Sequence, residues 1–142
     1  MPANTFSIGR DCSLVVMAPT GRIDLTYVTA FESRQLTVPV RVDCIDGVAL
    51  GAELPKGWDG SFELERGDSA VDDFIASMEA SFINGQNLGA GTLYQYVAEP
   101  DGSTSTYQYS NVVFKLAQAG TWRGDASVKQ RLEFFASQRR RV

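Results

Sequence analysis

The sequence predicts a mainly β protein with one α-helix: an antiparallel β-sandwich or barrel of about seven strands, with the helix between strands four and five. Polar and apolar residues alternate over most of the chain, which is the period of a strand with one buried face. Turn residues separate these stretches at fairly even spacing, and only one stretch has helical spacing. The 142 residues are expected to form a single domain, with an N-terminal arm at 1–10 and a basic C-terminal tail at 138–142.

Three strands are expected before the middle of the chain. Residues 12–18 form an apolar run, and residues 22–27 and 36–45 alternate between polar and apolar side chains. The connections at 28–35 and 46–57 are expected to be loops that are long for a compact domain. These loops mix charged and apolar residues, which is typical of segments that contact another subunit.

The second half supplies the remaining four strands and the helix. Strands are expected at 58–66, 92–99, 104–118 and 127–137, with an amphipathic helix at 69–84. A serine that can cap this helix and an aspartate three residues later form a capping-box pattern. The apolar stripe of the helix is expected to be used fully by the core. The expected core residues are Trp58, Phe62, Leu64, Phe74, Ile75, Met78, Phe82, Leu132 and Phe134.

The composition excludes several kinds of catalytic and metal site. Histidine is absent, which removes Ser-His-Asp triads, Cys-His nucleophiles and histidine metal ligands. Cys12 and Cys44 are too few for a zinc site or a disulfide framework; they are expected to be small buried apolar residues, with a disulfide as the alternative. No catalytic, cofactor-binding or metal-binding residue is predicted, no cofactor is implied, and the protein is not expected to be an enzyme.

The charge distribution argues against general nucleic-acid binding. The chain carries 13 Lys and Arg against 17 Asp and Glu, a net charge of −4. Three of the basic residues are Arg139, Arg140 and Arg141, so the rest of the chain has 10 basic and 17 acidic residues, a net charge of −7. Proteins that bind DNA neutralise phosphates with Lys and Arg, and this body offers few. The N-terminus has no secretory signal and no stretch is long enough to span a membrane, so assembly in the cytoplasm is expected.

Two residue patterns leave other functions open. Neighbouring acids, Glu63 with Glu65 and Asp72 with Asp73, are the nearest candidates for a general acid–base pair, although a solvated face or a salt bridge is the simpler interpretation. Two Tyr-x-Tyr pairs on consecutive expected strands could stack bases or sugars, or pack across strands or against another subunit. These tyrosines are Tyr94, Tyr96, Tyr107 and Tyr109.

The order of several motifs resembles the tail tube protein of contractile-tailed bacteriophages. The segment Gly57–Arg66 (GWDGSFELER) precedes the amphipathic helix. After the helix come, in this order, Tyr94-x-Tyr96, the Asp101-Gly102 turn, Tyr107-x-Tyr109, Asn111-Val-Val-Phe114 and Gln130-Arg-Leu-Glu-Phe-Phe-Ala136. The resemblance covers nearly the whole chain. The tube protein of the type VI secretion system shares the family's fold.

The resemblance implies a structural virion protein. In such tails six copies form a ring, the sheets of the copies join into one inner β-barrel, and the rings stack into a tube inside the sheath. Genome DNA and the tape-measure protein pass through the lumen without specific binding, and the implied partners are the sheath, baseplate and terminator proteins, with no membrane. The implied location is the tail of a virion assembled in the host cytoplasm. The alternatives are a type VI-like or pyocin-like tube subunit and a small-molecule-binding β-barrel.

Two sets of residues are candidates for the surfaces of such a tube. The polar faces of the strands at 22–27 and 36–45 are expected to line the lumen, because polar and apolar residues alternate cleanly there. These candidates are Arg22, Asp24, Thr26, Thr37, Arg41 and Asp43. The two expected loops are candidates for contact between rings, through Phe31, Glu32, Arg34, Leu50, Glu53, Leu54 and Lys56.

Overall fold

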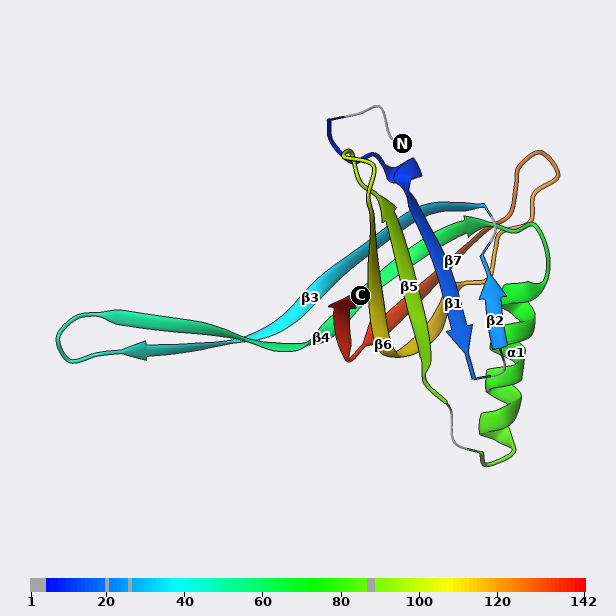
Figure 1. Ribbon diagram of the computed structural model, residues 1–142. Coiled ribbons are helices and arrows are strands. Elements are labelled where there is room, and N and C mark those ends of the chain that lie inside the picture. The colour runs from blue at the N-terminus through cyan, green and yellow to red at the C-terminus, as the bar shows by residue number, and fades with distance from the viewer. Residues whose placement is uncertain (1–4, 20, 26, 87–88) are drawn as a thin grey trace.

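The computed structural model describes residues 5–19, 21–25, 27–86 and 89–142. Eight strands in this part of the chain form one antiparallel sheet in the order β2-β1-β5-β6-β7-β4-β3, with β8 also paired to β6. The sheet does not close, because its two end strands, β2 and β3, are not paired to each other. The elements, shown in Figure 1, are η1 (Gly9–Asp11), β1 (Cys12–Ala18), β2 (Gly21–Asp24), β3 (Val28–Asp43), β4 (Ala49–Glu65), α1 (Ala70–Ile83), β5 (Gly91–Ala98), β6 (Thr104–Gln118), β7 (Lys129–Ala136) and β8 (Gln138–Arg141).

The predicted fold class is confirmed: the protein is mainly antiparallel β, and its one described helix lies between strands four and five. The count rises from seven to eight because the expected last strand at 127–137 corresponds to β7 and is followed by a further strand, β8, in the segment expected as a tail. Ser137 separates them, and its amide N–H donates to the carbonyl oxygen of Ser110 on β6 (3.0 Å). The segment expected as a basic tail therefore contributes a strand to the sheet.

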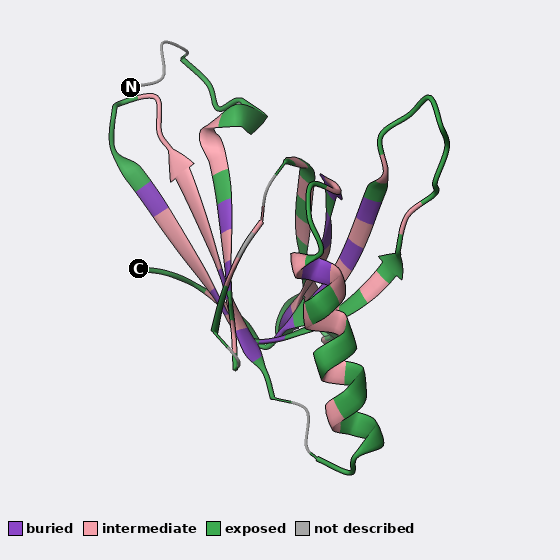
Figure 2. Cartoon of the chain, turned by 90° about the vertical axis from the view of Figure 1, so that its right-hand side faces the viewer, coloured by how far each residue is buried: buried purple, intermediate pink, exposed green. Residues whose placement is uncertain are grey.

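The long strand β6 belongs to two layers of the sheet. Residues 104–112 pair with β5, and residues 113–118 pair with β7. The change occurs at Asn111, whose φ of 53° is one that asparagine tolerates better than most residues. The sheet folds over at this point, so that β2, β1 and β5 face β7, β4 and β3 like the two sides of a V (Figure 2).

The core lies between these two layers. Tyr109 on β6 packs edge-to-face against Phe134 on β7, with ring centroids 5.5 Å apart. Its hydroxyl donates to Ser33 Oγ (3.0 Å), so the polar end of this buried ring is satisfied. Leu93 from the first layer and Phe62 from the second are also buried. Among the expected core residues Phe62, Leu64, Leu132 and Phe134 are buried, while Trp58, Phe74, Ile75 and Met78 are half-buried.

Helix α1 closes one open end of the core. Val71 is buried, and Phe74 packs edge-to-face on Phe114 at 5.8 Å. The expected capping box does not form. Instead, Asp68 Oδ1 accepts a hydrogen bond from the Ala70 amide (3.0 Å), and Ser69 Oγ donates to Asp73 Oδ2 in the first turn (3.0 Å). No described helix is long and apolar enough to cross a membrane.

The prediction that Phe82 belongs to the core is wrong. Phe82 is 67% exposed and Ile83 is 74% exposed, so the last turn of α1 extends past the end of the sheet. The apolar stripe is therefore only partly used by the protein's own core. Only the earlier turns reach it, because the helix has 14 residues and spans about 21 Å.

The predicted loops at 28–35 and 46–57 are also wrong. Residues 28–35 are the first half of β3, and residues from Ala49 onward belong to β4. Phe31, expected in a contact loop, stacks on Phe134 at 5.9 Å and packs against the core. The second segment contains Gly51 and Pro55, which are common in turns. The part of β4 before Trp58 pairs only with β3 among the described residues, and an edge of this kind tolerates them.

Candidate assembly surfaces

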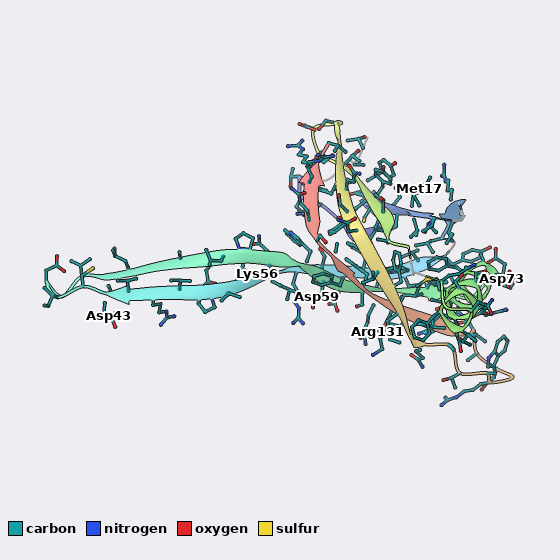
Figure 3. The ribbon with its side chains drawn as sticks, turned by 90° about the horizontal axis from the view of Figure 1, so that it is seen from below. Met17, Asp43, Lys56, Asp59, Asp73 and Arg131 are labelled. Carbon is teal, nitrogen blue, oxygen red and sulfur yellow. The ribbon has the colours of Figure 1, made fainter. Side chains whose placement is uncertain are left out.

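The ends of β3 and β4 project from the body as a two-stranded ribbon (Figures 1 and 3). We call residues 36–57 the distal hairpin. Its tip is the Asp46-Gly47 turn, in which Gly47 has a φ of 87° and the Cys44 amide donates to the Val48 carbonyl (2.8 Å). Nearly every residue of the distal hairpin is exposed. An isolated two-stranded ribbon is marginally stable in water, so this element gains from a partner.

One face of the distal hairpin is apolar. The cross-strand pairs on this face are Val38 with Leu54, Val40 with Ala52, and Val42 with Leu50. All six side chains are exposed. A contiguous apolar stripe of this kind marks a surface for contact with another protein, because water does not solvate it favourably.

The other face of the distal hairpin is mostly polar. It carries Thr37, Arg41 and Asp43 on β3 and Glu53 on β4, and Thr37 Oγ1 donates to Glu53 Oε2 (2.8 Å). The hairpin therefore has two sides of different chemistry, which allows it to lie between an apolar surface and water.

A β-bulge fixes the base of the distal hairpin. The β3–β4 register shifts between Gln35 and Thr37, opposite Gly57. Gly57 has a φ of 114°, and a Cβ there would lie 2.9 Å from the Ala136 carbonyl oxygen and from the Phe135 ring. Only glycine fits both the backbone conformation and the space, so the sequence specifies where the ribbon leaves the body.

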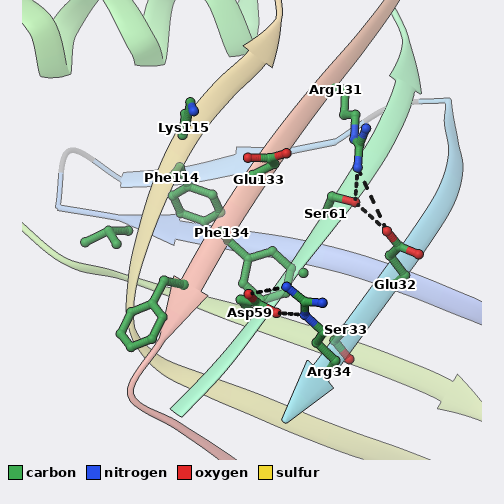
Figure 4. A pocket seen from close by; sticks show the side chains of 13 residues that line it. Glu32, Ser33, Arg34, Asp59, Ser61, Phe114, Lys115, Arg131, Glu133 and Phe134 are labelled. Atoms are coloured by element: carbon green, nitrogen blue, oxygen red, sulfur yellow. Dashed lines mark hydrogen bonds and ion pairs between the residues drawn. The ribbon is translucent and has the colours of Figure 1, made fainter. Parts of the chain in front are cut away.

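The second surface is the outer face of β3, β4, β7 and β6, which we call the polar wall. It carries an open pocket of about 610 Å³ (Figure 4). Three cations and three anions line it, so their charges cancel. The charged lining residues are Glu32, Arg34, Asp59, Lys115, Arg131 and Glu133.

The charges of the polar wall are joined across strands. Arg34 Nε donates to Asp59 Oδ1 at 2.7 Å, and Arg34 Nη2 donates to the other carboxylate oxygen at 3.2 Å. These hydrogen bonds, and then the charge of Asp59, raise the pKa of the Arg34 guanidinium above its ordinary value. Arg131 Nη2 donates to Ser61 Oγ (3.4 Å) and lies 4.0 Å from Glu32. The wall thus carries balanced charges and offers little net attraction to an anion.

The third surface is the C-terminal strand. Arg139 lies over the Tyr107 ring, 3.8 Å from its centroid, and 4.9 Å from that of Trp58. Arg140 donates to Gln108 Oε1 and Arg141 to Ser105 Oγ, both at 3.2 Å. The three arginines of the expected tail are therefore held in fixed positions on β8, and the last two are exposed. We call Arg139–Arg141 the arginine strip.

The expected lumen residues do not share one surface. Arg22 and Asp24 are on β2, at one end of the strand order, while Thr37, Arg41 and Asp43 are on β3, at the other end. The two strands are not neighbours either, because β2 pairs with β1 and β3 pairs with β4. Thr26 lies outside the described residues.

The expected contact residues divide between two surfaces. Glu32 and Arg34 are in the polar wall, whereas Leu50, Glu53, Leu54 and Lys56 are in the distal hairpin. Sequence reasoning missed the wall residues of the other strands, Asp59, Lys115, Arg131 and Glu133. The sequence signal that could have found them is that they alternate with apolar residues along their strands, which places them on the face away from the core.

The other patterns give no catalytic arrangement. Tyr94 and Tyr96 stack on each other, with centroids 6.3 Å apart, while Tyr109 is buried. Cys12 and Cys44 are free, half-buried thiols. Within the described residues no three His, Cys, Asp or Glu side chains form a group that could hold a metal ion. Asp72 is used structurally, since it accepts hydrogen bonds from Arg66 (2.9 Å) and from the Gln130 side-chain amide (2.8 Å).

The fold of the chain is similar to that of several solved structures. No protein-family model and no curated protein matches the chain. Among the solved structures that resemble it are three that match over 88–95% of their own length. A chain in the sheath/tube terminator of an extracellular contractile injection system, in the extended state, has a TM-score of 0.63 and 11% identity, covering 92% of this chain and 93% of that one. A chain in the sheath-tube complex of such a system has a TM-score of 0.63 and 11% identity, covering 92% and 88%.

The third similar structure is the tube-terminating cap of the anti-feeding prophage. Its TM-score is 0.62 at 9% identity, and the match covers 100% of this chain and 95% of that one. At these identities the likeness establishes a shared fold and no more.

Proposed function

We propose that the protein is a structural subunit of a contractile tail or contractile injection particle, and that its copies stack as rings into the inner tube. The observation that carries the proposal is the fold, shared over 92–100% of this chain with chains from such particles. In this proposal six copies form a ring, the sheath surrounds the tube, and baseplate and terminator proteins bind its ends. DNA and a tape-measure protein occupy the lumen of a phage tail, and a protein cargo would occupy that of a type VI-like or pyocin-like particle.

The open sheet supports assembly through strand edges. Within the described residues strand β3 is unpaired on one side, and so is the stretch of β6 at residues 113–118. Unpaired edges invite pairing with another chain, and a closed ring of copies removes them. Because β3 and this part of β6 bound the same four strands, joining them between neighbours would give a continuous inner barrel whose wall is the polar wall.

The distal hairpin supports contact between rings. It extends beyond the body and presents an apolar stripe to solvent, which a neighbouring ring would cover. Its polar residues Thr37, Arg41 and Asp43 would then continue the channel surface. The proposal therefore retains these three of the lumen residues predicted from the sequence. Residues of the polar wall take the place of Arg22 and Asp24.

The small-molecule-binding alternative has less support. A barrel that holds an apolar ligand needs an enclosed, mostly apolar cavity. Here the sheet is open, and the pocket lies on its outer face, where six charged side chains share the lining with apolar ones such as Val113 and Phe135. The same features give no argument for an enzyme, and we propose a purely structural role.

Negative-stain electron microscopy of the purified protein tests the proposal. Rings and hollow tubes are expected, and a protein that stays monomeric at high concentration would contradict it. To test the lumen assignment, Lys115→Cys is made in a background with Cys12→Ser and Cys44→Ser. A bulky maleimide should label position 115 in free subunits but not in assembled tubes, and equal labelling in both states would refute the assignment.

A further inference from the structure

The two ends of the body carry opposite charge. Helix α1 contains three acids, Asp72, Asp73 and Glu79, and no basic residue. Strand β8 contains three arginines in four residues. Figures 1 and 2 both place α1 and the C-terminal strand on opposite sides of the body. A molecule with complementary charges on opposite sides can bind a copy of itself head to tail.

The arginine strip is prepared for binding because its side chains are already ordered. Arg139 is held by Tyr107 and Trp58, and its buried Nε has no hydrogen-bond partner among the described residues, so the aromatic rings provide its stabilisation. Arg140 and Arg141 each use one nitrogen for a neutral side chain of β6. A guanidinium has five N–H donors, so most remain available to a carboxylate. Prior ordering lowers the entropy that binding costs.

The acidic helix is suited to be the partner surface. Asp73 and Glu79 are exposed, and Asp73 accepts one hydrogen bond from Ser69, whereas Asp72 is engaged with Arg66 and Gln130. The last turn adds the exposed apolar side chains Phe82 and Ile83. Charge together with uncovered apolar surface on one element is typical of an interface.

We propose that, within each ring, the arginine strip of one subunit binds helix α1 of the next. This inference rests on the proposed function and identifies the lateral contact within it. The contact is heterologous, because it uses two different surfaces of the same chain, and such contacts close into rings when the rotation between neighbours allows it. Exposed ion pairs contribute modestly, so the contact adds specificity and orientation to the joining of the strand edges.

Two charge-reversed variants test the contact. The first carries Arg140→Glu and Arg141→Glu, and the second carries Asp73→Lys and Glu79→Lys. Each variant alone places like charges at every contact. In an equimolar mixture, copies that alternate around the ring restore opposite charges at every contact. We expect each variant alone to need at least tenfold more protein to assemble at low salt, and the mixture to recover most of this loss.

Controls separate this contact from general charge effects. Arg10→Glu with Arg123→Glu gives the same change in net charge as the first variant, at exposed sites elsewhere, and it should assemble at the wild-type concentration. Thermal unfolding of each variant checks that the subunit is folded. If either reversed variant assembles like wild type, or if the mixture fails to recover, the inference is wrong.

The association of the two variants is also measured without tubes. Sedimentation of the mixture should show a heterodimer that neither variant forms alone, and its absence would overturn the inference. Microscopy of the wild type decides the proposed function separately. Tubes that grow normally from each variant but fail to bind a sheath would assign the arginine strip to a different partner and refute the lateral contact.

Discussion

Removing apolar surface from the distal hairpin should weaken stacking without unfolding the subunit. The variant Val42→Ser with Leu50→Ser changes one cross-strand pair of the apolar face. These side chains are 52% and 56% exposed, so a docked partner can bury the remaining half of each. Full burial of such a residue contributes about 1.5–3 kcal/mol, and half burial of two therefore contributes about 1.5–3 kcal/mol in total. The association constant per subunit should fall about 10- to 150-fold.

The assay is the protein concentration at which tubes form, followed by light scattering and confirmed by microscopy. The matched control is Arg41→Ser with Asp43→Ser, which alters the opposite face at the same distance along the hairpin and leaves the net charge unchanged. The control should assemble within about threefold of wild type, because exposed charges contribute little. The reasoning is refuted if the apolar variant assembles at the wild-type concentration. A loss of several degrees in its melting temperature would show that the apolar face packs on its own body.

Three further predictions concern stability. Phe74→Ala should destabilise the subunit by about 2 kcal/mol, because this ring is half-buried, whereas Phe82→Ala should change the urea midpoint negligibly. Gly60→Ala should cost about 1–3 kcal/mol, because its Cβ would collide with the backbone of β3, while Gly51→Ala, with 3.9 Å of room, should be tolerated. Hydrogen bonds from Ser103 lower the pKa of Asp101 in the folded state. The ionised carboxylate therefore stabilises the folded state above pH 3.8, the ordinary pKa of aspartate, and this stabilisation is lost as the pH falls through the lowered pKa. Asp101→Asn should therefore lose less stability than wild type between about pH 4 and pH 2 in urea titrations.

Strand alternation predicted the core of the second layer correctly. Phe62, Leu64, Leu132 and Phe134 occupy alternate positions and are buried. The first half of β3 escaped prediction because one of its inward positions is Ser33. That serine is acceptable inside only because its Oγ accepts a hydrogen bond from the hydroxyl of Tyr109, 76 residues later, and no local pattern reveals such a partner.

The surfaces depended on information that lies outside any single segment. The polar wall combines strands that are distant in the sequence: Lys115 pairs with Glu133, 18 residues later, and Glu133 pairs with Ser61, 72 residues earlier. Alternation shows which residues of one strand share a face, but the register between strands decides which charges meet. Helical periodicity likewise placed Phe82 on the face of Phe74, yet the length of the core beneath α1 decides which of them is covered.

The marginal stability of a lone ribbon has a consequence for the kinetics of growth. In a free subunit the distal hairpin has only its own ladder of hydrogen bonds, and its apolar face is wet. The free energy that it costs to order the hairpin would then be offset only by contacts with an existing ring. Folding of this segment and elongation of the tube would therefore be coupled. Two free subunits would nucleate a filament slowly, whereas a preformed template would extend at once. Assembly from purified protein should therefore show a lag that added tube fragments abolish.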